Sequence, residues 1–198
     1  MRGRWIVACV LGEALGIAAV ATTYAAIDRG LLQPEALWVL AAGAWEGLCL
    51  GGAQALILSS VGVRAWLWIA LTVLGAVAGY ALSLFAGAGA DGAASSGEPP
   101  LALLLALGAA LGAAMGVMMG AVQWLAARNK IALMRWILAN GVGWMPAMAV
   151  IMLAATSVER VWPLYVITFI GAIAGALAGL FVGAATSFAL PRIMRAHA

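Results

Sequence analysis

Charged residues are scarce in this chain of 198 residues, and their scarcity excludes most classes of soluble protein. Only 9% of the residues are charged, whereas about a quarter are charged in a typical soluble domain. Ten basic and seven acidic side chains can neither keep a disordered chain in solution nor form an extended basic face for nucleic acid. With 66% apolar residues and a mean hydropathy of +1.10, the composition indicates an integral membrane protein.

Histidine and cysteine are also rare. The single histidine, His197, stands in the C-terminal tail, so ligation of haem by an internal histidine is excluded. Cys9 and Cys49 lie in different apolar segments, and neither a disulfide framework nor a metal motif follows from them. The sequence contains no recognisable nucleophile beside a base and no phosphate-binding loop. We therefore expect neither an enzyme nor a protein with a resident metal or cofactor.

Six apolar segments are each long enough to cross a bilayer as a helix, which takes about 20 residues. They cover residues 5–26, 38–60, 66–85, 101–127, 136–156 and 164–190. The segments lack the alternation of a strand, and a backbone in lipid must satisfy its hydrogen bonds internally. The predicted fold is one all-α transmembrane domain of six helices over residues 1–198. Residues 86–100 are rich in small residues and proline, and predict a flexible external loop.

The few charges are divided unequally between the two sets of predicted loops. Eight of the ten basic residues fall at the chain ends and in alternate loops: Arg2, Arg4, Arg64, Arg128, Lys130, Arg135, Arg192 and Arg195. This set contains no acid, whereas the other loops contain Asp28, Glu35, Asp91, Glu98 and Glu159, with Arg29 and Arg160. The positive-inside rule then predicts that both termini are cytoplasmic. The lipid bilayer is the expected partner, nucleic acid is not, and other membrane subunits are candidates.

Tryptophan is abundant by comparison, with nine residues. Six of them lie at the ends of predicted segments: Trp5, Trp38, Trp66, Trp68, Trp136 and Trp162. Amphipathic indole rings are enriched at membrane–water interfaces. These six tryptophans are therefore interpreted as an interfacial belt.

The odd and the even segments each resemble one another, which predicts one helical hairpin used three times. The odd segments align as WIVACVLGEALG, WIALTVLGAVAG and WILANGVGWMPA, with a small polar residue four positions after each Trp. The even segments share glycines at four-residue spacing: Gly43, Gly47, Gly51, Gly112, Gly116, Gly120, Gly171, Gly175 and Gly179. Such glycines allow close helix packing, against one another or against the odd helices. The hairpins span about 1–60, 64–127 and 132–190, related by an axis along the membrane normal.

The segment GVMMGAVQWLAAR, residues 116–128, resembles a GxxxGxxQWL-type motif of a widespread group of uncharacterised bacterial multi-pass membrane proteins. The first copy, GLCLGGAQALILS from Gly47, keeps Gly51, Gln54 and Leu56 but lacks the Trp and the Arg, and the third copy also lacks the Gln. The resemblance implies a bacterial inner-membrane location and no particular activity. In size and number of segments, the chain is also similar to substrate-binding subunits of energy-coupling-factor transporters, without a ligand motif of theirs.

Two acids, Glu13 and Glu46, lie inside predicted segments, where an ionised acid costs about 2.5–3.5 kcal/mol on insertion scales. Two interpretations are open: a proton or cation relay, or protonated donors that fasten helices. Both acids belong to the first hairpin, which makes it the expected functional unit. Gln54, Gln123 and Asn140 complete the candidate intramembrane polar site, although interhelical hydrogen bonding is their simplest use.

These features predict a non-enzymatic bacterial inner-membrane protein that acts as a small carrier-like or ligand-binding membrane subunit. An intramembrane acid favours this function, because a carrier needs a polar site near mid-depth. The alternative is a structural accessory subunit that packs against a larger membrane complex and needs no such site.

Overall fold

The computed structural model describes residues 1–90 and 100–190, without the side chains of residues 86–90. In these ranges the chain forms six long helices: α1 (Arg2–Asp28), α2 (Glu35–Leu58), α3 (Ala65–Ala90), α4 (Leu101–Ala127), α5 (Leu133–Thr156) and α6 (Leu164–Ser187). A short 3₁₀ turn over Ser59–Val61 follows α2. Each long helix is apolar and long enough to cross a bilayer. The prediction of an all-helical, multi-pass membrane fold is confirmed.

The predicted helix boundaries lie within three residues of the observed ones except at the end of α3. This helix continues to Ala90, so residues 86–90 of the predicted loop are helical, while residues 91–99 lie outside the described residues. The helices α2, α4 and α6 each begin directly after a proline: Pro34, Pro100 and Pro163. A proline disfavours helix in the residue before it, which favours a helix start at this point. The predicted starts of α4 and α6 coincide with the observed ones, whereas α2 begins three residues earlier than predicted.

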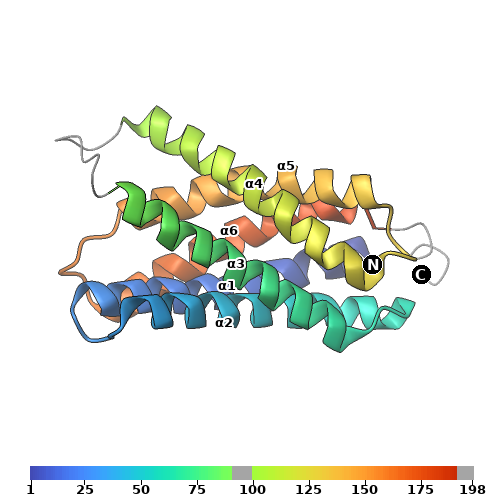
Figure 1. The fold of residues 1–198 in the computed structure, drawn as a ribbon, viewed down its shortest axis with the longest axis horizontal. Coiled ribbons are helices and arrows are strands. Elements are labelled where there is room, and N and C mark those ends of the chain that lie inside the picture. Colours follow the sequence, from blue (N-terminus) through green and yellow to red (C-terminus); the bar gives the residue numbers. More distant parts are fainter. Residues whose placement is uncertain (91–99, 191–198) are drawn as a thin grey trace.

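The six helices run along one common direction and form a single bundle (Figure 1). Consecutive helices pack side by side, and α6 packs along α1, which closes the ring. The most extensive pairings join α1 to α6 and α4 to α5, and the least extensive pairing of neighbours is α3 with α4. Residues 5 and 186 meet at one end of the bundle, so the start of α1 and the end of α6 lie together. We call this end the terminal end and the other the loop end.

The glycine series of each even helix faces the odd helix that follows it around the ring. A methyl group on Gly47 of α2 would lie 2.7 Å from the Val73 Cα of α3, and one on Gly116 of α4 would lie 2.8 Å from the Asn140 carbonyl carbon of α5. Backbone atoms cannot move aside, so these helix pairs require glycine. A Cβ at Gly43 would meet the Tyr80 side chain, and one at each of the other eight would lie within 3.3 Å of a backbone atom of the facing helix: Gly47, Gly51, Gly112, Gly116, Gly120, Gly171, Gly175 and Gly179.

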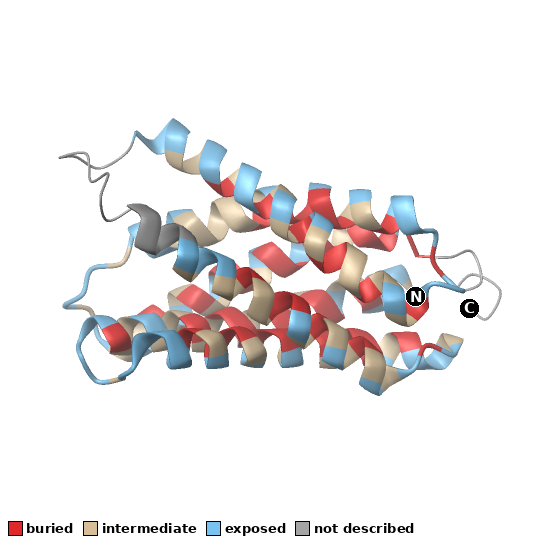
Figure 2. Ribbon diagram, viewed as in Figure 1, coloured by how far each residue is buried: buried red, intermediate tan, exposed pale blue. Residues whose placement is uncertain are grey.

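Three tryptophans of the predicted interfacial belt lie instead in the core. Buried residues follow the inside of the bundle along its length (Figure 2), and Trp5, Trp68 and Trp136 are each 0% exposed. The Trp136 ring centroid lies 6.0 Å from that of Trp5 and 5.6 Å from that of Trp68, both in edge-to-face contact. The belt interpretation is wrong for these three, because the position along a helix sets depth while its rotation decides whether a ring faces lipid or protein.

Candidate functional site

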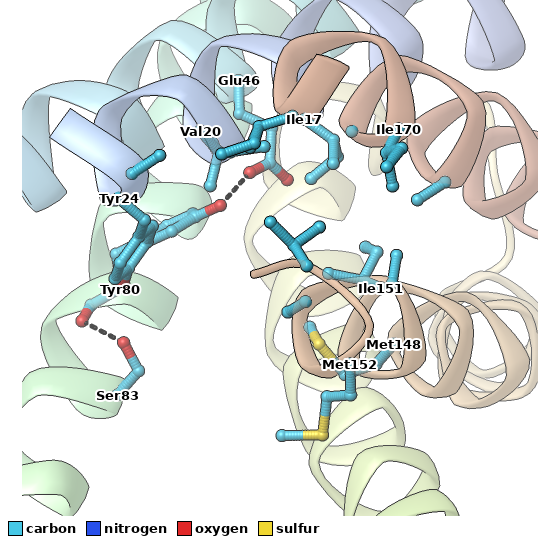
Figure 3. Close-up of a pocket in the computed structure, with 18 of the residues that line it drawn as sticks. Ile17, Val20, Tyr24, Glu46, Tyr80, Ser83, Met148, Ile151, Met152 and Ile170 are labelled. Carbon is cyan, nitrogen blue, oxygen red and sulfur yellow. Dashed lines mark hydrogen bonds between the residues drawn. The ribbon is translucent and has the colours of Figure 1, made fainter. Parts of the chain in front are cut away.

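A cavity of about 360 Å³ lies in the half of the bundle toward the loop end, and residues from all six helices line it. Its walls are mainly aliphatic and methionine side chains, including Ile17, Val20, Met148, Ile151, Met152 and Ile170 (Figure 3). Asp28, Arg29 and Arg160 form part of its rim. The cavity therefore combines an apolar interior with charged groups at the loop end of the bundle.

Glu46 of α2 brings a carboxyl group into this apolar interior (Figure 3). The hydroxyl of Tyr80 on α3 donates a hydrogen bond to Glu46 Oε2. Gly16 of α1 makes room for the acid, because a Cβ at this position would lie 2.8 Å from Glu46 Cγ. Glu46 is 6% exposed and is held where α1, α2 and α3 meet. Among the described residues that line the cavity, Glu46 is the one whose carboxyl group lies away from the rim.

The deep end of the cavity is formed, beside Glu46, by one residue from each of four helices: Gly79, Met115, Trp144 and Ala174. The Trp144 side chain is 3% exposed, and its Nε1 has no hydrogen-bond partner in the described part of the chain. A buried indole N–H without a partner is an unused hydrogen-bond donor. Away from the rim, the site thus offers the Glu46 carboxyl group, the hydroxyl groups of Tyr24, Tyr80 and Ser83 and the Trp144 indole within an otherwise apolar enclosure.

Glu13, the second intramembrane acid, is fully buried but does not line the cavity. Neither of its carboxyl oxygens has a hydrogen-bond partner among residues 1–90 and 100–190. The turn of α1 that contains it packs against the turn of α2 between Glu46 and Leu50, because Gly12 and Gly16 contact those two residues. A fastening hydrogen bond therefore exists for Glu46 through Tyr80, and the described residues offer none to Glu13.

The amides form a second polar cluster, nearer the terminal end. Gln123 Nε2 donates to Gln54 Oε1 at 3.3 Å and to Thr72 Oγ1 at 3.1 Å. Trp68 Nε1 donates to the same Gln54 oxygen at 3.0 Å, and Gln54 Nε2 lies 3.5 Å from Cys9 Sγ. These contacts connect α1, α2, α3 and α4 beside the three buried tryptophans that meet edge to face.

The five residues of the predicted polar site do not form one site in the structure. Asn140 Nδ2 donates to the Trp136 carbonyl oxygen of its own helix at 3.0 Å. None of Gln54, Gln123 and Asn140 lines the cavity, and Glu46 is the one residue of the five that does. The sequence placed the amides nearer the terminal end than Glu46, and the structure keeps that difference in depth: Gln54 lies eight residues beyond Glu46 on α2, about 12 Å along the helix.

Sequence reasoning missed Tyr80 and Trp144 as functional candidates. Trp144 lies eight residues inside its predicted segment, too deep for an interfacial belt, and that depth was an available signal. Tyr80 carried no such signal, because it stands only five residues from the predicted end of its segment, where a tyrosine is ordinary. Its contact with Glu46 depends on how α2 and α3 pack.

No known family model, curated protein or solved structure matches this chain. The resemblance to bacterial multi-pass proteins with GxxxGxxQWL-type motifs therefore stays a prediction. Within the described residues, no three His, Cys, Asp or Glu side chains are grouped so that they could hold a metal ion.

Proposed function

We propose that this protein is a carrier-like or ligand-binding membrane subunit, without enzymatic activity, that holds a small apolar ligand in the six-helix cavity. The observation that carries the proposal is Glu46 with its Tyr80 partner inside an apolar cavity of about 360 Å³. Small-molecule sites are commonly apolar enclosures of about 300–1,000 Å³ with a few polar groups. An ionisable residue inside a membrane bundle commonly marks a substrate or ion path.

We also infer that the chain consists of three hairpins related by rotation about the membrane normal. Contacts at equivalent alignment positions support this: Cys9 with Gly179, Thr72 with Gly51 and Asn140 with Gly120. The three aligned tryptophans also meet in the core. At the position of Glu46 the other two copies have Met115 and Ala174, and both line the cavity. The cavity then lies on the proposed axis, and only the first hairpin supplies an acid to it.

The proposed orientation has both termini in the cytoplasm of a bacterium, with the cavity rim facing outward across the inner membrane. In a chain whose Cys9 and Cys49 are replaced by alanine, a membrane-impermeant maleimide should label Val161→Cys in intact cells. Ser60→Cys should react only after lysis. Both positions are exposed, at the loop end and the terminal end respectively. Labelling of Ser60→Cys in intact cells, with Val161→Cys protected, would reverse the orientation.

Filling the cavity tests the ligand site. Ile170→Trp places a larger side chain in the cavity wall, and Ile173→Trp makes the same change on the outer face of α6, where Ile173 is 47% exposed. We expect native mass spectrometry to find one bound N-phenyl-1-naphthylamine, a neutral apolar probe, on the unmodified protein and on Ile173→Trp. Ile170→Trp should lose it.

Equal retention by the three proteins would refute the ligand site. If the protein is instead an accessory subunit, the membrane complex that contains it should keep its full activity when the cavity is filled. The two tryptophan variants are matched in size, helix and residue replaced, so a difference between them reports the cavity and not the added indole.

A further inference from the structure

We propose that the ligand of this cavity is a lipophilic organic cation, a quaternary or protonated amine with bulky apolar groups, that exchanges with a proton at Glu46. This inference rests on the proposed ligand site and names its substrate class. It follows from the charge balance of the cavity, from the groups around Glu46 and from the aromatic residues that border the same space.

The Glu46 carboxyl group faces no cationic side chain among the described residues. Its titratable neighbours are Tyr80 on α3, Cys49 on its own helix, and Glu13 and Tyr24 on α1. The helices α4, α5 and α6 present Met115, Trp144 and Ala174. All of these are acidic, weakly acidic or apolar. No group of the protein that we can describe would neutralise an ionised Glu46.

The two arginines at the rim already have partners. Arg160 forms an ion pair with Asp28 at 3.9 Å, and Arg29 donates hydrogen bonds to the carbonyl oxygens of Arg160 and Trp162. Both lie at the loop end of the cavity, about two helical turns or more beyond the level of Glu46. They leave the carboxyl group at the deep end without a counter-ion.

A carboxylate in an apolar membrane cavity is costly unless it is paired. Glu46 therefore holds either a proton or an external cation, and the two compete for one site. When the cation binds, the Glu46 O–H bond breaks, both electrons stay on the carboxylate oxygen, and the proton leaves through the rim to water. The pair formed is carboxylate and cation, so charge is conserved in the exchange.

Three aromatic residues support a cation rather than a polar neutral ligand. Tyr24, Tyr80 and Trp144 border the cavity with Glu46, and aromatic rings attract quaternary ammonium and similar ions. Ser83 also lines the cavity, but its hydroxyl donates to the Tyr80 carbonyl oxygen at 2.8 Å. Apart from Ser83 and the rim, the remaining walls are alkyl and thioether groups that offer a sugar or amino acid few hydrogen bonds. An anionic ligand would be repelled by the Glu46 carboxylate.

The test uses two ions of nearly equal size and shape but opposite charge, tetraphenylphosphonium and tetraphenylborate. Isothermal titration of the purified full chain in detergent should show binding of the phosphonium and none of the borate. Titrations in buffers of different ionisation enthalpy should show a proton released on binding at low pH. Affinity for the phosphonium should fall as the pH falls, approaching tenfold per pH unit once Glu46 is protonated in the free protein.

Glu46→Gln should reduce the affinity for tetraphenylphosphonium at least tenfold at high pH and abolish the proton release. Tyr80 can still donate to the amide oxygen, so we expect this variant to fold. Glu159→Gln is the matched control: it removes the same charge from an exposed acid at the loop end and should bind and release protons like the unmodified protein. Elution of each variant as a single species on size exclusion verifies its fold.

The result separates this inference from the proposed function. If the neutral probe binds and the phosphonium binds no better than the borate, the ligand site stands and the cation class is wrong. If Glu46→Gln and Glu159→Gln bind the phosphonium equally, Glu46 is not the exchanging group. If neither the neutral probe nor the phosphonium binds, both the site and its substrate class are refuted.

Discussion

Replacing Trp68 with alanine is expected to lower the free energy of unfolding by on the order of 3 kcal/mol, whereas Trp66→Ala should change it little. Trp68 is 0% exposed, contacts the Trp136 ring and donates a hydrogen bond to Gln54. Trp66, two residues earlier on α3, is 66% exposed. Reversible unfolding in mixed detergent micelles, followed by circular dichroism, would measure the two changes.

The physical reason lies in packing rather than in transfer from water. Lipid chains are as apolar as a protein core, so burial of an indole gains little hydrophobic energy within a membrane. Its removal instead leaves a void between helices that glycine contacts hold close, and it takes a donor from Gln54. Similar small losses for both variants would return Trp68 to the interfacial belt that the sequence suggested.

Gly116→Leu is expected to prevent α4 and α5 from packing and to yield little folded protein. A Cβ at Gly116 would lie 2.8 Å from the Asn140 carbonyl carbon and 2.9 Å from Trp144 Cβ, and the first of these is backbone. Gly52→Leu is the control, because no atom lies within 4 Å of a Cβ built there. Expression yield and the size-exclusion profile in detergent would distinguish the variants.

A folded Gly116→Leu with normal yield would show that the close contact of α4 and α5 is dispensable. For the same reason, a substitution at Gly116 cannot test whether the protein is an accessory subunit. Gly47 and Gly116 both face helices of their own chain, so leucine there disturbs the bundle before it disturbs a partner. A surface for another membrane subunit has to be sought on outward positions, such as Gly52 on α2.

The sequence by itself determined the class of protein and the number and approximate ends of the helices. These are local properties: hydropathy summed over about 20 residues decides whether a segment spans a membrane, and a proline or a charged loop marks its end. It also singled out Glu46 as an unusual intramembrane acid, because an ionised acid is costly in lipid wherever it occurs. The glycine series was recognised as packing positions, because glycine allows close helix approach in any membrane bundle.

Only the tertiary structure decided which way each helix face turns. The rotation of α3 buries Trp68 and exposes Trp66, although the two are only two residues apart and both belong to the predicted belt. The packing of α2 on α3 brings Tyr80 to Glu46, and the packing of α4 on α3 brings Gln123 to Thr72 and within reach of Gln54. These pairings join residues far apart in the chain. They depend on which helices are neighbours in the ring and how closely glycine lets them approach, and no single segment carries that information.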